Sequence, residues 1–65
     1  MNEFNKFDKW NALRELLYIK EDDLAIYKER HSNTEDEYTK SLYQELILRR
    51  EHEIEGLKKW LEEYR

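Results

Sequence analysis

The fold of this chain is decided by the stretch HSNTEDE at residues 31–37. Its first four residues, HSNT, favour helices poorly because their side chains compete for backbone hydrogen bonds. The overlapping four, TEDE, fit a capping box, in which Thr34 accepts a hydrogen bond from the amide of Glu37 and Glu37 reaches back to the amide of Thr34. The sequence therefore predicts one helix that ends near Arg30 and a second that begins at about Glu35.

The composition excludes most alternatives to a helical fold. The chain has no proline and no cysteine, and its only glycine is Gly56. Small strand-rich domains need the turn chemistry of glycine and proline, and a disulfide framework needs cysteine. We therefore expect a single all-α domain over residues 1–65, an antiparallel two-helix hairpin of the coiled-coil type. Its helices are predicted at about 3–30 and 35–64, with the turn at 31–34.

Apolar residues recur at spacings of three and four along both predicted helices. The first stripe follows Phe7, Trp10, Leu13, Leu17, Lys20, Leu24 and Tyr27, and the second follows Tyr43, Ile47, Arg50, Ile54, Leu57, Leu61 and Tyr64. One cation interrupts each stripe. We expect the stem of Lys20 to pack while its charged end reaches water. Arg50 either does the same or fixes the register by pairing with Glu15 or Asp8.

A register can be derived from the predicted turn. If the turn centres on residue 32, residues that face each other have numbers that sum to about 64. The facing pairs are then Phe4 with Trp60, Phe7 with Leu57, Trp10 with Ile54, and Leu17 with Ile47. Apolar residues meet at each of these levels, which favours a hairpin. We find no internal repeat in the chain.

A chain of 65 residues is marginally stable alone, because it removes only about 60% of its unfolded surface from water. Without disulfides or thiolate zinc sites, the common remaining route to stability is association. Several apolar residues are left over once the two stripes face each other, and we expect them to form a dimer or partner interface. They are Leu16, Ile19, Ile26, Tyr38, Leu42, Leu46 and Trp60.

Three arrangements would cover these residues. A second copy of the hairpin would give a four-helix bundle with two-fold symmetry. A groove or helix on a different protein would serve equally. The third possibility is burial within a curved hairpin.

No motif for catalysis or cofactor binding is found. The two histidines, His31 and His52, are not part of a zinc or di-iron pattern, and one His52-x-x-Glu55 pair is near chance among 16 acids. General acid–base chemistry needs a carboxylate in a pocket, which a hairpin does not provide. We therefore expect neither an enzyme nor a metal or cofactor site.

The charge and hydropathy of the chain argue against nucleic acid and membranes as partners. The net charge is −4, and acids interleave with the basic pairs Arg49-Arg50 and Lys58-Lys59, so nucleic-acid binding is disfavoured. No apolar run approaches the 18 residues of a membrane span, and the N-terminus has no signal-peptide pattern. We expect a cytoplasmic protein.

Taken together, these features predict a small non-enzymatic interaction module, a homodimeric helical regulator or inhibitor that binds another protein through an apolar helical face. Two alternatives remain open at this point. One is a purely structural coiled-coil assembly unit, and the other is a nucleic-acid-binding hairpin.

Overall fold

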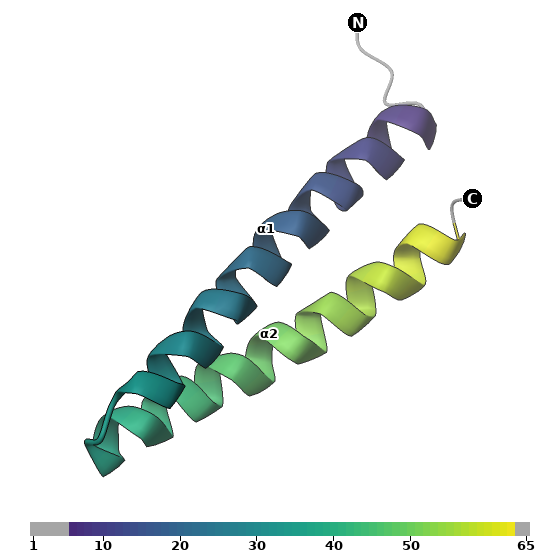
Figure 1. The fold of residues 1–65 in the computed structure, drawn as a ribbon. Helices are drawn as coiled ribbons and strands as arrows, with labels where there is room; N and C mark the ends of the chain where they lie inside the picture. The colour runs from purple at the N-terminus through teal and green to yellow at the C-terminus, as the bar shows by residue number, and fades with distance from the viewer. Residues whose placement is uncertain (1–5, 64–65) are drawn as a thin grey trace, which may run out of the picture.

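The structure, a computed structural model, describes the backbone of residues 6–63 and the side chains of residues 8–63. Helix α1 (Lys6–Asn33) and helix α2 (Glu37–Glu63) run antiparallel and pack against each other, and no strand occurs within this range. The start of α1 and the end of α2 lie together at one end of the hairpin, opposite the turn (Figure 1). The predicted all-α hairpin is thus confirmed, while the helix ends expected at residues 3 and 64 lie outside the described residues.

Helix α1 continues three residues beyond the predicted end at Arg30. The amide of Thr34 still donates to the carbonyl of Arg30, over 3.1 Å, in the helical pattern. The residues HSN at 31–33 are weak helix formers, but each costs less than about 1 kcal/mol, and neither glycine nor proline breaks the chain here. Arg30 and His31 also lie in the last turn, where the helix dipole favours positive charge.

Helix α2 is capped by Asp36 instead of Thr34. The carboxylate oxygen Oδ2 of Asp36 accepts hydrogen bonds from the amide of Thr39, at 3.0 Å, and from its Oγ1 hydroxyl, at 2.6 Å. Oγ1 of Thr34 accepts a bond from the amide of Asp36, at 3.3 Å, and so shapes the turn. The predicted capping box between Thr34 and Glu37 is therefore wrong. The turn occupies residues 34–36 because α1 extends past its expected end.

The later turn changes the register of the hairpin. With the turn centred on residue 35, facing residues have numbers that sum to about 70. The rings of Tyr27 and Tyr43, whose centroids lie 6.1 Å apart, follow this rule. Leu17 consequently lies at the level of Ile54, and the predicted pairing of Leu17 with Ile47 is wrong. Among the residues whose side chains are described, the two predicted stripes do line the seam, but they are displaced along each other.

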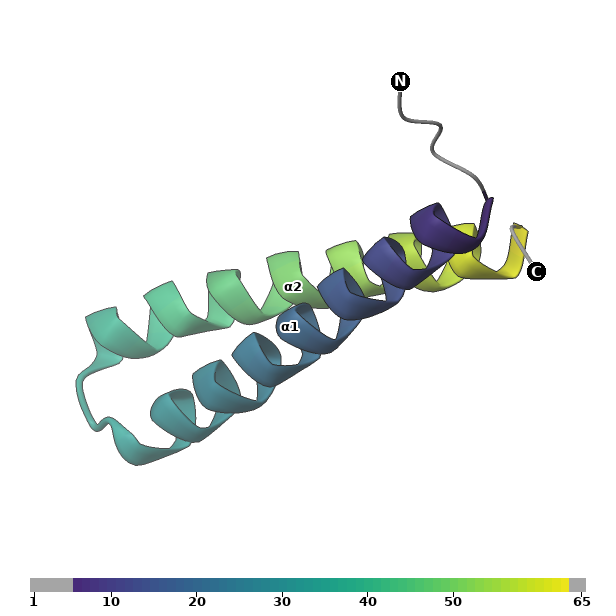
Figure 2. The ribbon, with the colours of Figure 1, turned by 90° about the horizontal axis from the view of Figure 1, so that it is seen from above.

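The two helices also cross. Their ribbons overlap near the turn in Figure 1, whereas from above they overlap near the opposite end (Figure 2). The hairpin measures 51 × 20 × 16 Å, so it is long and thin. Only three described hydrophobic side chains, those of Leu17, Ile47 and Ile54, are buried, and none of the described side chains is fully enclosed. Two crossed helices surround little space between them, which keeps the core small.

Candidate interaction surface

One side of the seam between α1 and α2 is apolar and hollowed. A hollow of about 420 Å³ lies between the two helices on this side. It is lined by Leu16, Lys20, Glu53, Gly56, Leu57 and Trp60. Because Leu16 belongs to α1 and Trp60 to α2, exposed apolar side chains of both helices meet here.

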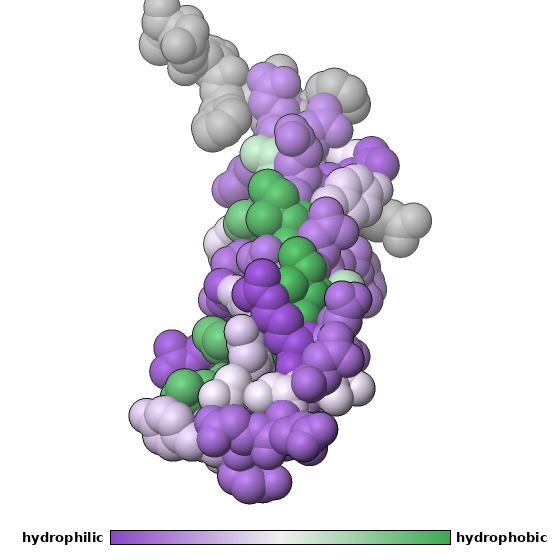
Figure 3. Space-filling model, turned by 60° about the vertical axis from the view of Figure 1, so that its left-hand side comes forward, coloured by the Kyte–Doolittle hydropathy of each residue, from purple (hydrophilic) through white to green (hydrophobic). Residues whose placement is uncertain are grey.

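The heptad spacing extends this side along the molecule. Residues seven apart fall on one line of a coiled-coil helix. Leu46 lies seven residues before Glu53 and fourteen before Trp60, and Ile19 and Ile26 are also seven apart. We name the resulting surface the apolar face, made of Ala12, Leu16, Ile19, Ile26, Leu42, Leu46 and Trp60. In the space-filling view, hydrophobic side chains form separate groups along the long axis, with hydrophilic ones on both flanks (Figure 3).

Most residues predicted for the interface are exposed in the hairpin. Leu16, Ile19, Ile26, Leu42 and Trp60 expose between 39% and 56% of their surface. Leu46 is half-buried, since it lies closer to the seam. These residues are therefore not buried by curvature of the hairpin. Tyr38 is also exposed, but it lies in the first turn of α2, beyond the end of the apolar face.

The opposite side of the seam also carries exposed apolar side chains, Tyr18 and Leu48. Tyr18 is partly covered by Arg14, whose Nη2 donates to the tyrosine hydroxyl over 2.8 Å. The same guanidinium lies 5.0 Å from the centroid of the Trp10 ring and 5.4 Å from that of the Tyr18 ring. The spacing of four residues between these three side chains is a signal for such stacking that the sequence contained.

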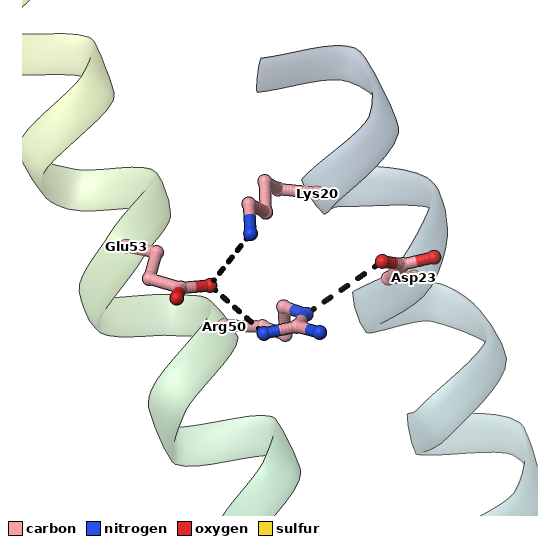
Figure 4. Close-up of polar contacts among 4 residues, drawn as sticks. All are labelled: Lys20, Asp23, Arg50 and Glu53. Atoms are coloured by element: carbon pink, nitrogen blue, oxygen red, sulfur yellow. Dashed lines mark hydrogen bonds and ion pairs between the residues drawn. The ribbon is translucent and has the colours of Figure 1, made fainter. Parts of the chain in front are cut away.

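An ion cluster interrupts the apolar face at its middle (Figure 4). Oε1 of Glu53 lies 3.2 Å from Nζ of Lys20 and accepts a hydrogen bond from Nη1 of Arg50 over 3.0 Å. Nε of Arg50 lies 3.6 Å from Oδ2 of Asp23, which is an ion pair but too long for a hydrogen bond. The cations that interrupt the two stripes thus meet at one level. Within the hairpin, Arg50 pairs with Asp23 and Glu53 instead of with Glu15 or Asp8, because the register differs, and a pairing with Glu15 or Asp8 of a second copy stays a prediction.

The cations of the ion cluster change the pKa of its glutamate, Glu53. The hydrogen bond from Lys20, together with the positive charges of Lys20 and Arg50, lowers the pKa of Glu53 below the usual glutamate range. Glu53 therefore stays ionised at neutral pH and balances the two cations. Lys20, Asp23, Arg50 and Glu53 together carry no net charge.

The opposite edge of the seam is closed by two further ion pairs. Lys28 Nζ lies 3.7 Å from Glu51 Oε2, and Lys58 Nζ lies 3.9 Å from Glu21 Oε2. We name these four residues the charged edge. Exposed pairs of this kind contribute little stability each. They nevertheless make this side hydrophilic, so the two sides of the hairpin differ in character.

The described part of the chain has neither a metal-binding cluster nor a helix that could span a membrane. Residues 6–63 contain no group of three histidine or carboxylate side chains placed to hold a metal ion. Within the same range, neither helix has the continuous apolar stretch that crossing a membrane requires. Two buried side-chain donors, Nε1 of Trp10 and Nε of Arg50, have no hydrogen-bond partner among the described residues.

Comparison of the chain with protein-family models, with curated proteins and with solved structures found no match.

Proposed function

We propose that this chain is a small non-enzymatic interaction protein, which self-associates through the apolar face and binds another protein as a helical regulator or inhibitor. A single observation carries the proposal, the apolar face itself. Several large exposed apolar side chains on one side of a small protein are typical of an interface.

The size of the core supports an associating protein. A hairpin with three buried hydrophobic side chains gains little from burial, whereas ordering its backbone and side chains costs roughly 1.5 kcal/mol per residue. Covering the apolar face would remove a second set of large side chains from water. Two hairpins that cover each other in this way would form a four-helix bundle.

The proposal favours protein over nucleic acid as the partner. Two cations in the middle of the apolar face, Lys20 and Arg50, are already neutralised by acids of the same chain. Those of the charged edge are paired as well. Nucleic-acid binding depends on cations that are free to replace counterions along the phosphates.

The first test measures self-association by sedimentation equilibrium. We expect the wild-type chain to sediment as a dimer and the Ile19→Asp variant to sediment as a monomer at the same concentration, with helix content retained at high concentration. A charge on the apolar face must be desolvated on association, which weakens the dimer strongly. Leu16→Asp, closer to the seam, should act in the same direction.

The matched control is Leu48→Asp. Leu48 and Ile19 are both 56% exposed, but Leu48 lies three residues from Glu51, beside the charged edge. The control should keep the mass of the wild type. Equal masses for wild type and Ile19→Asp would contradict the proposed face, and a wild-type monomer at all accessible concentrations would contradict self-association. A labelled oligonucleotide that binds with a steep salt dependence would favour the nucleic-acid alternative.

A further inference from the structure

The two helices contain an internal repeat, contrary to what we expected from the sequence. Residues 15–24 read ELLYIKEDDL and residues 45–54 read ELILRREHEI. At this offset of 30, the two glutamates and the leading leucine are identical. Four further positions are conservative: Leu17 matches Ile47, Lys20 matches Arg50, Asp23 matches Glu53, and Leu24 matches Ile54.

The ion pairs between the helices obey the same offset. Adding 30 to Lys20 gives Arg50, and subtracting 30 from Glu53 gives Asp23. The pair of Lys20 with Glu53 therefore maps onto the pair of Arg50 with Asp23. On the charged edge, the pair of Lys28 with Glu51 maps in the same way onto that of Lys58 with Glu21.

The environments of matched residues agree as well. The side chains of Lys20 and Arg50 are 23% and 22% exposed, and those of Lys28 and Lys58 are 57% and 59% exposed. Leu17 and Ile47 are both buried. The repeat is therefore present in the packing and not only in the sequence.

This repeat gives the hairpin an approximate two-fold axis. Two antiparallel helices exchange places under a two-fold rotation whose axis is perpendicular to the plane that contains both of them. Here the axis passes between Lys20 and Arg50, at the centre of the ion cluster, and it crosses the apolar face at a right angle. Under this axis Leu16 corresponds to Leu46 and Ala12 to Leu42, on opposite sides of the cluster. The remaining members of the apolar face do not follow the repeat, because Ile19, Ile26 and Trp60 correspond to Arg49, Gly56 and Arg30. The two-fold pattern is therefore clearest in the ion cluster and in the leucines beside it.

We infer that the occupant of the apolar face is a second copy of this chain, placed so that the ion clusters of the two copies lie against each other and set the register of the dimer. This inference rests on the proposed self-association. The ion cluster is alike in both directions along the hairpin and has a leucine on each side, Leu16 and Leu46, so it can lie against the cluster of a second copy in an aligned register.

Charge and area both fit a second copy. The ion cluster is neutral overall, so two clusters in contact create no net repulsion. The chain exposes 5503 Å², roughly 1,000 Å² more than the area of about 4,500 Å² that a compact protein of 8.2 kDa exposes. Each partner of a stable dimer covers about 800 Å².

The ion cluster also explains why a charged group remains in an apolar face. Polar groups within a helical interface lower stability but disfavour shifted registers, in which they would lie against apolar side chains. A shift of one heptad would place the four charges of each copy against leucine and isoleucine of the other. The aligned register is the one in which all eight charges can stay paired.

Two complementary variants test this register. Asp23→Asn with Glu53→Gln leaves a cluster of charge +2, and Lys20→Gln with Arg50→Gln leaves a cluster of charge −2. One variant is labelled with ¹⁵N, the two are mixed, and native mass spectrometry separates the heterodimer from the homodimers. We expect each variant alone to dimerise more weakly than wild type, and the mixture to contain heterodimer well above the statistical one half. This excess should shrink at high salt.

The matched control uses the charged edge. Glu21→Gln with Glu51→Gln, mixed with Lys28→Gln and Lys58→Gln, removes the two ion pairs of the charged edge but leaves the apolar face unchanged. This mixture should contain the statistical one half of heterodimer. If the cluster mixture is also statistical while wild type is a dimer, the register inference is overturned and the proposed self-association stands. A monomeric wild type overturns both.

A variant that is unfolded alone remains informative. If mixing the complementary variants restores the helical circular dichroism, the clusters face each other and the inference is supported. If mixing restores nothing while wild type is a folded dimer, the inference is overturned.

Discussion

The side chain of Asp36 caps the start of α2, because its carboxylate accepts hydrogen bonds from two donors of Thr39. Its carboxylate accepts bonds from the amide and the hydroxyl of Thr39, three residues ahead. These hydrogen bonds, the side-chain bond first and then the backbone bond, lower the pKa of Asp36 below the usual aspartate range. The carboxylate also faces the positive end of the helix dipole, where a negative charge is stabilising.

We predict that Asp36→Ala lowers the melting temperature, by on the order of 5 °C at neutral pH, because the first turn of α2 loses its cap. The measurement is thermal unfolding followed by circular dichroism. Glu35→Ala is the matched control, because it removes the same charge from the same turn but leaves both bonds between Asp36 and Thr39. A melting temperature for Asp36→Ala that equals the control would show that the cap contributes nothing.

The same pair of proteins gives a pH prediction. Because the pKa of Asp36 is lower in the folded than in the unfolded chain, the carboxylate contributes stability above the unfolded value of about 3.9. That contribution is lost as the pH falls through the lower folded pKa. The difference in melting temperature between wild type and Asp36→Ala should thus be constant from neutral pH to about 5 and shrink below about 4. A difference that grows on acidification would contradict this assignment.

At the scale of the elements, the length of α1 determines the register. Three additional helical residues move the turn to 34–36 and bring the cations of the two stripes to one level. This alignment gives Lys20 and Arg50 a shared acid in Glu53. With the turn at residues 31–34, the two cations would have lain about six residues apart along the hairpin.

The two helices, their apolar stripes and their antiparallel packing could be predicted from the sequence. The spacing of apolar residues and the scarcity of helix-breaking residues are local properties that can be read directly from the sequence. The sequence was insufficient for the register, because two caps, Thr34 and Asp36, compete within three residues and differ by small energies. The internal repeat is weak in the sequence alone, because only three of its ten aligned positions are identical. It becomes clear in the structure, where Lys20 and Arg50 occupy equivalent places.

We predict that Leu17→Ala destabilises the hairpin by about 2 kcal/mol, since it removes one of its few buried side chains. Leu48→Ala is the control, because it deletes the same atoms from a side chain that is 56% exposed, and it should change stability by less than about 0.5 kcal/mol. Urea unfolding measured at a high protein concentration compares the two. Equal effects would mean that the seam is not the core of the fold.

At the scale of the whole molecule, a long hairpin with a small core has much surface for its mass. The apolar face, the ion cluster and the charged edge divide that surface into sides of different chemistry. Stability that depends on covering the apolar face must depend on how many copies are present, because association favours the folded form by mass action.

We therefore predict that the melting temperature of the wild-type chain rises with protein concentration. A series from micromolar to millimolar, measured by circular dichroism, should show a steady increase. The Ile19→Asp variant should melt at one temperature across the series, because its dimer is weakened. A wild-type melting temperature that is independent of concentration would indicate that the hairpin is stable without a second copy.

The placement of both open helix ends at one end of the hairpin has a mechanical consequence. A pulling force applied between the start of α1 and the end of α2 would be perpendicular to the helix axes. It would therefore separate the two helices from their open end and would not slide one helix past the other. The contacts would then break one level at a time, beginning near Leu13 and Leu57 and reaching the tyrosine pair last. Such a geometry yields at lower force than one in which all levels must slide together, so an optical-tweezers trace should show gradual extension with a pause at the central charges.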